Sequence, residues 1–99
     1  MKIVGIIPSR FNSSRLPGKP LIDILGLPMI VHVYLRCIMA KTLDDMYVAT
    51  DSKEIANVVS SYGGKYIMTS NSHETGTDRI AEAAESIDCD IVVNIQGDE

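Results

Sequence analysis

Residues 3–20 read IVGIIPSRFNSSRLPGKP, and this stretch joins a short apolar run directly to a segment rich in proline and positive charge. Residues 3–7 are almost entirely apolar, which is typical of a strand buried on both faces of a parallel sheet. The loop expected at 8–27 carries three fixed positive charges, and loops of this length in a small domain usually carry function. We therefore predict that a buried strand is followed by a stiff loop at one edge of a sheet. This loop carries the positive charges of Arg10, Arg15 and Lys19.

Three further apolar runs follow polar turns, and we predict that they are strands, at residues 46–50, 65–69 and 91–95. Segments with helical spacing separate them. Strands that alternate with helices imply parallel pairing through right-handed crossovers. We therefore predict an α/β fold with three layers and a parallel sheet, in the strand order 3-2-1-4 that is commonest among mononucleotide-binding sheets. Three helices cover only part of the two faces of a four-stranded sheet, so the chain is expected to be part of a larger domain.

Local signals predict where the helices begin. Pro28 fits the first turn of one helix. Asp51 and Glu54 resemble a capping box, with Asp51 as the N-cap, and Thr75 or Thr77 is expected to cap the last helix. The helix of residues 29–39 is apolar on most sides, so it is expected to be deeply buried, or buried against a partner chain.

The composition excludes several classes of protein. Hydrophobic residues make up 45% of the chain and charged residues 22%, as in ordinary globular proteins. The net charge of −4 argues against a general nucleic-acid surface. No apolar run approaches the roughly 20 residues of a membrane span, and no signal peptide is expected. Cys37 and Cys89 lack metal-binding spacing and are expected to be reduced thiols, which fits a cytoplasmic protein.

Charges of opposite sign are expected to meet at one edge of the sheet. In open α/β sheets, ligands bind beyond the carboxyl ends of the strands, where the strand order reverses. The order 3-2-1-4 makes the first and fourth strands neighbours, so the basic loop would face Asp98. Arg and Lys bind phosphates, and Mg²⁺ commonly bridges a carboxylate and phosphate oxygens. These residues therefore predict a site for a nucleoside triphosphate with Mg²⁺.

The basic loop matches neither of two common phosphate-binding patterns. Pro20 follows Lys19 where GxxxxGK[ST] requires Ser or Thr, and GxGxxG is absent. Prolines on both sides of Lys19 stiffen the loop and lower the entropy lost on binding. Two readings stay open for Arg15, which either contacts the ligand or braces the loop through a salt bridge.

Several segments together resemble the sugar cytidylyltransferases, and among them the members that act on 3-deoxy-manno-octulosonate (KDO). They are IIPSRFNSSRLPGKPL at 6–21, GLPMIVHV at 26–33, VATDS at 48–52, MTSNSHETGTDRIAEA at 68–83 and VVNIQGDE at 92–99. The resemblance implies a Rossmann-like nucleotidyltransferase fold, in which residues 1–99 would be the N-terminal, nucleotide-binding part of a single domain. Ser9 and Phe11 stand where the family often has Ala and Tyr.

The resemblance also implies a reaction. In a Mg²⁺-dependent step toward lipopolysaccharide, CMP would pass from CTP to the anomeric 2-hydroxyl of KDO, and pyrophosphate would leave. Arg10 would stabilise charge on the α-phosphoryl oxygens, Lys19 would hold the pyrophosphate, and Asp98 would bind the metal. The complete protein would be a cytoplasmic homodimer that binds neither nucleic acid nor membrane. The nucleotide-binding residues would be Ser9, Arg10, Arg15, Lys19, Gly76, Thr77, Arg79 and Gln96.

Two alternatives stay open. One is a cytidylyltransferase for another sugar acid, such as sialic acid. The other is an inactive nucleotide-binding or assembly fragment, because the segment that would supply most of the sugar pocket is absent from these 99 residues.

Overall fold

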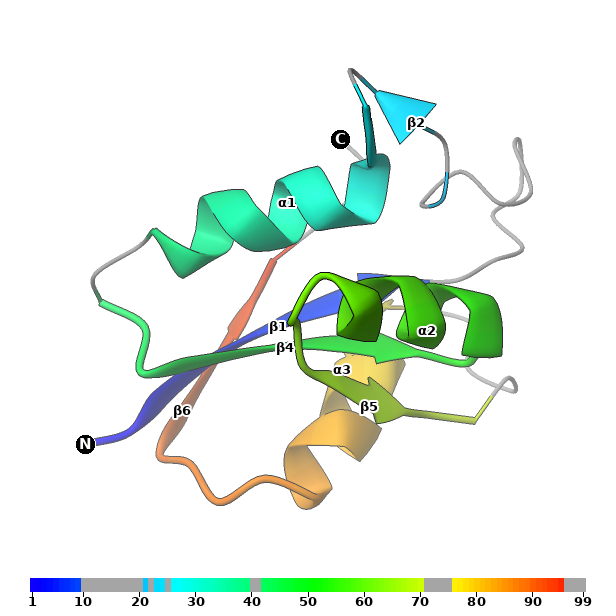
Figure 1. Cartoon of the computed structure of the whole chain (residues 1–99). Coiled ribbons are helices and arrows are strands. Elements are labelled where there is room, and N and C mark those ends of the chain that lie inside the picture. Colours follow the sequence, from blue (N-terminus) through cyan, green and yellow to red (C-terminus); the bar gives the residue numbers. More distant parts are fainter. Residues whose placement is uncertain (10–20, 22, 25, 40–41, 71–75, 96–99) are drawn as a thin grey trace.

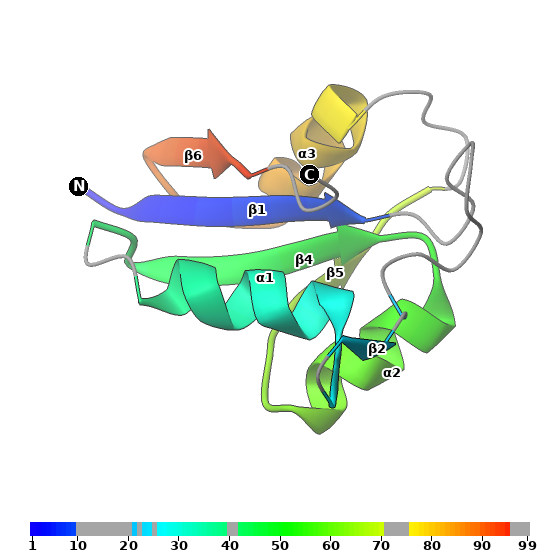
Figure 2. The same ribbon diagram turned by 90° about the horizontal axis from the view of Figure 1, so that it is seen from above.

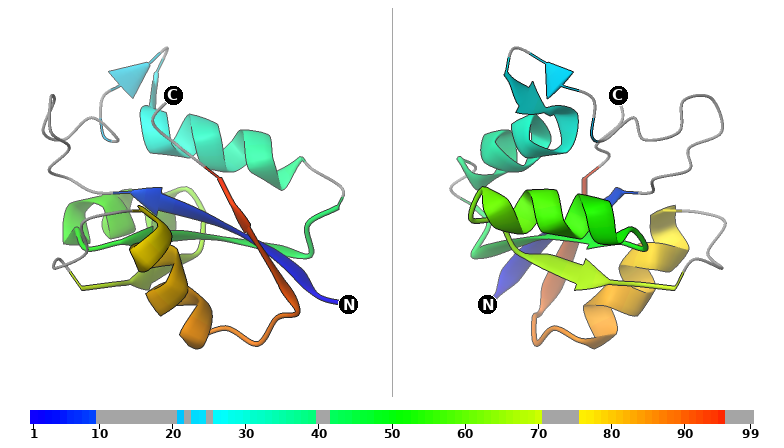
Figure 3. Two further views of the ribbon diagram at one scale, coloured as in Figure 1. Left: turned by 180° about the vertical axis from the view of Figure 1, so that it is seen from behind. Right: turned by 45° about the vertical axis from the view of Figure 1, so that its right-hand side comes forward.

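The structure is a computed structural model of the chain, and it describes residues 1–9, 21, 23–24, 26–39, 42–70 and 76–95, with 76 and 77 described by their backbone alone. Figures 1 and 3 show its elements from several sides. In chain order they are β1 (Ile3–Ser9), β2 (Asp23–Ile24), β3 (Leu27–Pro28), α1 (Met29–Ile38), β4 (Asp45–Thr50), α2 (Lys53–Ser61), β5 (Tyr66–Met68), α3 (Gly76–Glu85) and β6 (Ile91–Asn94).

The main sheet has four parallel strands in the order β5-β4-β1-β6. Counted along the chain without the hairpin β2–β3, this is the order 3-2-1-4, so the predicted sheet is confirmed. In β1, Ser9 lies level with Thr50 of β4, and Ile6 lies level with Asn94 of β6. β1 and β6 therefore pair directly, and their carboxyl ends lie at the same edge of the sheet (Figure 2).

Helices cover both faces of this sheet, which confirms the predicted three layers. Side chains alternate between the faces along a strand, so Val4 and Ile6 of β1 pack with α3, whereas Ile7 packs with α1 and α2. Figure 2 shows α3 on one side of β1, and α1 and α2 on the other. Each fully buried Val or Ile contributes about 1.5–3 kcal/mol relative to an exposed one. The two-sided burial of β1 is what its continuous apolar run predicts.

α1 is less buried than its composition predicts. Ile30, Val31 and Tyr34 are buried, whereas Leu35 and Ile38 are 43% and 52% exposed. α1 packs one stripe of side chains on β1 and β4, and its outer side stays open among the described residues. Deep burial within this chain is therefore wrong, and burial against a partner chain stays a prediction.

The expected loop at 8–27 contains an element that the sequence did not predict. β2 and β3 form a short antiparallel hairpin, in which Asp23 pairs with Pro28. The turn includes Gly26, whose φ of +91° lies in the left-handed region that favours glycine. Strands of two residues are too short to show an alternating pattern, so only this glycine hints at the hairpin.

α2 begins one residue later than predicted. The N-cap of α2 is Ser52, whose side chain accepts a hydrogen bond from the Ile55 N–H. Asp51 is not the cap, because its carboxylate pairs with Arg79 instead. Of the two predicted caps of α3, Thr77 lies inside the helix, which begins at Gly76, and Thr75 lies outside the described residues. None of the helices in the described ranges is long and apolar enough to cross a bilayer.

Candidate functional site

Buried polar side chains gather at the carboxyl edge of the sheet. Among the described residues, the buried polar or charged side chains are those of Ser9, Thr50, Thr69 and Arg79. Ser9 ends β1, Thr50 ends β4, Thr69 follows β5, and Arg79 lies near the start of α3. We call these four residues, together with Asp51, the polar edge. Buried polar groups need hydrogen-bond partners, so their concentration here distinguishes this edge from the apolar core.

Parallel pairing brings the members of the polar edge together. Ser9 is the register partner of Thr50, and the Thr69 N–H donates to the Thr50 carbonyl at 2.9 Å. The Thr50 hydroxyl oxygen accepts a hydrogen bond from the Ser52 N–H at 3.1 Å. The polar residues at the ends of three adjacent strands thus lie side by side, and hydrogen bonds join Thr69 to Thr50 and Thr50 to the start of α2.

Arg79 connects this row to α3. Its guanidinium donates to the Thr69 hydroxyl, to the Ser70 carbonyl at 3.2 Å and to the Asp51 carboxylate at 3.4 Å. The Arg79 side chain is fully buried, and its Nε finds no partner among the described residues. A buried charge is tolerated only where it is paired and hydrogen-bonded. Arg79 therefore fixes α3 against the ends of β4 and β5.

The structure describes some of the predicted site residues. Ser9 lies buried at the end of β1, and the backbone of Gly76 and Thr77 forms the first turn of α3. Arg79 follows them on the same helix, and all four lie toward the carboxyl edge. The other predicted site residues lie outside the described residues, namely Arg10, Arg15, Lys19, Gln96 and Asp98.

Sequence reasoning missed Thr50 and Thr69 as members of this edge. Thr50 is the last residue of β4, and Thr69 comes directly after β5. A polar residue at the carboxyl end of a largely apolar strand was the signal in the sequence that could have identified them. No group of three or more His, Cys, Asp and Glu side chains suited to a metal occurs in the described ranges. Such a cluster is not required for Mg²⁺, which commonly takes one or two carboxylates and completes its shell with phosphate oxygens and water.

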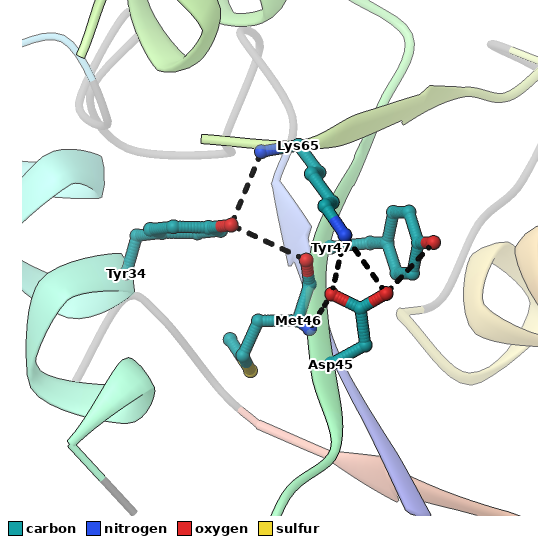
Figure 4. A network of polar contacts seen from close by, with 5 residues as sticks. All are labelled: Tyr34, Asp45, Met46, Tyr47 and Lys65. Atoms are coloured by element: carbon teal, nitrogen blue, oxygen red, sulfur yellow. Dashed lines mark hydrogen bonds and ion pairs between the residues drawn. The ribbon is translucent and has the colours of Figure 1, made fainter. Parts of the chain in front are cut away.

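A second polar network lies near the start of β4 (Figure 4), at the opposite end of that strand from Thr50. Lys65 Nζ donates to both carboxylate oxygens of Asp45 at 2.9 and 3.0 Å, and the Tyr47 hydroxyl donates to Asp45 at 3.1 Å. The Tyr34 hydroxyl joins the Met46 carbonyl to the Lys65 N–H. Burial raises the pKa of Asp45, but the hydrogen bonds from Lys65, Met46 and Tyr47 outweigh it and hold that pKa below the ordinary value.

Comparison with known proteins gives concordant matches. A sequence profile described as "Cytidylyltransferase" matches residues 4–99. The 3-deoxy-manno-octulosonate cytidylyltransferases of Trichlorobacter lovleyi and Escherichia coli are 56% and 51% identical over 99 and 98 residues, covering 100% and 99% of this chain. An 8-amino-3,8-dideoxy-manno-octulosonate cytidylyltransferase from Shewanella pealeana is 52% identical over 102 residues, again covering 100% of this chain.

Solved structures match as well. The structure of CMP:2-keto-3-deoxy-manno-octonic acid synthetase complexed with CTP is 50% identical, with a TM-score of 0.97 over 100% of this chain. A cytidylyltransferase from Leptospira borgpetersenii shares the fold at 24% identity, with a TM-score of 0.81 over 99% of this chain. The chain spans about two fifths of these proteins, between 39% and 42% of their lengths.

Proposed function

This chain belongs to the cytidylyltransferase family, and on that premise we propose that it forms the nucleotide-binding part of an enzyme that transfers CMP from CTP to KDO. The observation that carries the proposal is the 51% to 56% identity, over essentially all of this chain, to two proteins named for that reaction. Neither sialic acid transfer nor an inactive fragment is favoured by these relatives. Residues 1–99 would be the N-terminal part of one nucleotidyltransferase domain.

The proposed reaction forms a bond between the anomeric 2-hydroxyl oxygen of KDO and the α-phosphorus of CTP. The bond from that phosphorus to the pyrophosphate oxygen breaks, the hydroxyl proton is released to solvent, and negative charge develops on the phosphoryl oxygens. Arg10 and Lys19 supply fixed donors for this charge, which preorganised cationic groups stabilise strongly. Arg15 is proposed to bind the same phosphates. The direct pairing of β1 and β6 supports this arrangement, because the basic loop follows β1 and Asp98 follows β6 in the sequence.

Mg²⁺ is part of the proposal. Asp98 would hold it, and when bound the ion would neutralise phosphate charge as a Lewis acid. Ser9, Gly76, Thr77 and Gln96 are proposed to hold the cytosine and ribose of the nucleotide. Backbone N–H groups in the first turn of a helix such as α3 are available as donors to a ligand. The buried position of Ser9 at the end of β1 is compatible with such a contact.

A second sugar acid is also a candidate for the acceptor of CMP. The relative named for the 8-amino sugar is 52% identical to this chain, within the range of the relatives named for KDO. The described residues include none that we assign to the sugar acid, so this segment does not separate the two acceptors. We also propose a cytoplasmic location, as expected for an enzyme that uses a nucleoside triphosphate, and a homodimer, as the resemblance to the family implies.

Pyrophosphate release by the intact protein tests the proposal. CTP, UTP, ATP and GTP are each supplied with KDO, with 8-amino-KDO, with sialic acid or with no acceptor, in the presence and absence of Mg²⁺. We expect release only with CTP, an octulosonate acceptor and Mg²⁺. Release from another nucleotide, or with sialic acid alone among the acceptors, would refute the proposed function.

A further inference from the structure

Arg79 was predicted to be one of the nucleotide-binding residues, but its position favours another role than direct contact with the base. Its side chain is fully buried, and its guanidinium is already engaged by Thr69, Ser70 and Asp51. We propose that Arg79 is a positioning residue, which holds the ends of β4 and β5 and the first turn of α3 in one fixed arrangement for the nucleotide. This inference rests on the proposed function, because the arrangement matters to CTP only if CTP binds there.

The hydrogen bonds of Ser70 show how α3 holds the end of β5. Arg79 donates to the Ser70 carbonyl at 3.2 Å, and the Glu82 carboxylate accepts from the Ser70 N–H at 3.0 and 3.1 Å. Residues 79 and 82 are three positions apart, so they lie on the same face of the helix. One helix face therefore holds both backbone polar groups of a single residue, Ser70, beyond β5.

Asp51 extends this attachment to β4. Arg79 reaches its carboxylate at 3.4 Å, and Asp51 lies between the last residue of β4 and the N-cap of α2. The planar guanidinium presents donors in several directions at once, which a lysine ammonium on a flexible stem does not do in the same geometry. A single side chain thus ties the starts of two helices, α2 and α3, to the ends of two strands.

The burial of Arg79 indicates that this residue fixes the geometry of the site rather than stabilising the fold. Replacing a buried ion pair by apolar residues of similar volume is often neutral or stabilising, so stability alone gives no reason for an arginine here. Gly76 and Thr77, which are proposed to hold the base and ribose, begin the helix that Arg79 anchors. A shift of this helix would move both residues relative to Ser9 on β1.

The test uses Thr69→Val and Thr69→Ser in the intact protein, with Arg79→Lys as a third variant. Valine keeps the shape of threonine but removes the oxygen that accepts from Arg79, whereas serine keeps the oxygen. Since a hydrogen bond to a charged group is lost, we expect Thr69→Val to raise the KM for CTP roughly 10-fold, with kcat nearly unchanged. Thr69→Ser is expected to restore the wild-type KM, and Arg79→Lys to raise it as Thr69→Val does.

Preference for CTP over UTP separates positioning from direct reading of the base. We expect this preference to survive in Thr69→Val and Arg79→Lys. Its loss in Arg79→Lys alone would make Arg79 a direct reader and overturn the inference. A lower Tm with an unchanged KM for CTP, measured well below that Tm, would reduce Arg79 to a structural role and overturn it too.

Amide hydrogen exchange without nucleotide keeps this inference separate from the proposed function. The Thr69 and Ser70 N–H groups are hydrogen-bonded in the structure, and we expect their exchange to be faster in Thr69→Val than in Thr69→Ser. Wild-type protein that releases no pyrophosphate from CTP would refute the proposed function. Exchange equal in the two Thr69 variants would refute the role of Arg79 whatever the assay shows.

Discussion

Asp45 is a described residue whose pKa changes on folding. Its pKa is lowered below the ordinary value of 3.8, since the hydrogen bonds from Lys65, Met46 and Tyr47 outweigh the effect of burial. The pKa of Lys65 is correspondingly raised by its hydrogen bond to Asp45. A carboxyl with a lowered pKa contributes stability above its unfolded-state pKa and loses that contribution as the pH falls through its folded-state pKa.

We therefore predict that Asp45→Asn makes the free energy of unfolding less dependent on pH in the acidic range. At neutral pH the variant is expected to be less stable than the wild type, and the difference is expected to shrink as the pH falls below 3.8. Urea unfolding between about pH 7 and pH 2.5 measures this. Asp88→Asn removes one carboxylate from an exposed position after α3 and serves as the control for net charge. Parallel loss of stability in wild type and Asp45→Asn would contradict the prediction.

Arg10 gives a residue-scale prediction about catalysis. If its guanidinium stabilises charge on the α-phosphoryl oxygens, Arg10→Ala should lower turnover of the intact protein roughly 100- to 1,000-fold, the range for one preorganised donor. Pyrophosphate release at saturating CTP and KDO measures it. Arg36→Ala removes the same charge from an exposed position in the last turn of α1 and is expected to leave turnover near wild type. Equal turnover in both variants would exclude Arg10 from the reaction.

Single residues were the hardest feature to predict from sequence. Asp51 and Ser52 are both good N-cap types, and the spacing to Glu54 favoured Asp51. The choice depends on Arg79, a residue 28 positions away, which draws the Asp51 carboxylate away from the helix. No local pattern contains that partner, so the cap was predicted one residue too early and the anchoring role of Arg79 was not predicted at all.

At the scale of elements, the end of α2 follows directly from its sequence. The Gly63 N–H donates to the Ser60 carbonyl at 3.0 Å, and the Gly64 N–H donates to the Val59 carbonyl at 2.9 Å. These two bonds make a Schellman motif, which needs a left-handed residue after the C-cap Tyr62. Gly63 has a φ of +83°, which is the left-handed conformation that this motif requires.

Gly63→Ala is predicted to destabilise the protein by about 1–2 kcal/mol, the cost of left-handed backbone for a residue with a Cβ. No heavy atom lies within 4 Å of a Cβ placed at this position, so the effect comes from the backbone alone. Gly63→Asn is the matched variant, since Asn tolerates this conformation better, and it is expected to lose less. Chemical unfolding gives both values. An alanine variant as stable as wild type, or less destabilised than the asparagine variant, would contradict this reasoning.

At the scale of the whole molecule, the strand order was predictable because few arrangements satisfy right-handed crossovers and buried apolar strands. The apolar runs of β1 and β4 favour central positions for these strands, which they occupy in the order β5-β4-β1-β6. The exposure of α1 was not predictable, because its apolar outer side looks the same in sequence whether or not something covers it. Leu35 and Ile38 are exposed here, in a chain that spans about two fifths of its relatives, 39% in one case.

β6 is an edge strand of the sheet and, like α1, has exposed apolar side chains. β6 pairs with β1 alone among the described strands, and Ile91 and Val93 are 41% and 38% exposed. Val92 packs on the side of α3, so by alternation Ile91 and Val93 lie on the opposite face. An open edge strand with exposed apolar side chains is a site for association with another chain, and a lysine there opposes it.

We therefore predict that the polypeptide of residues 1–99 associates in a concentration-dependent way, and that Val93→Lys reduces this association. Lysine places a charge beside the unpaired edge, which must be desolvated before another strand can pair there. Asn57→Lys adds the same charge at an exposed position on α2 and controls for the change in net charge from −4. Sedimentation velocity over a range of concentrations compares the three proteins. Association that Val93→Lys and Asn57→Lys reduce equally would reflect net charge alone, and the open edge of β6 would then have no part in it.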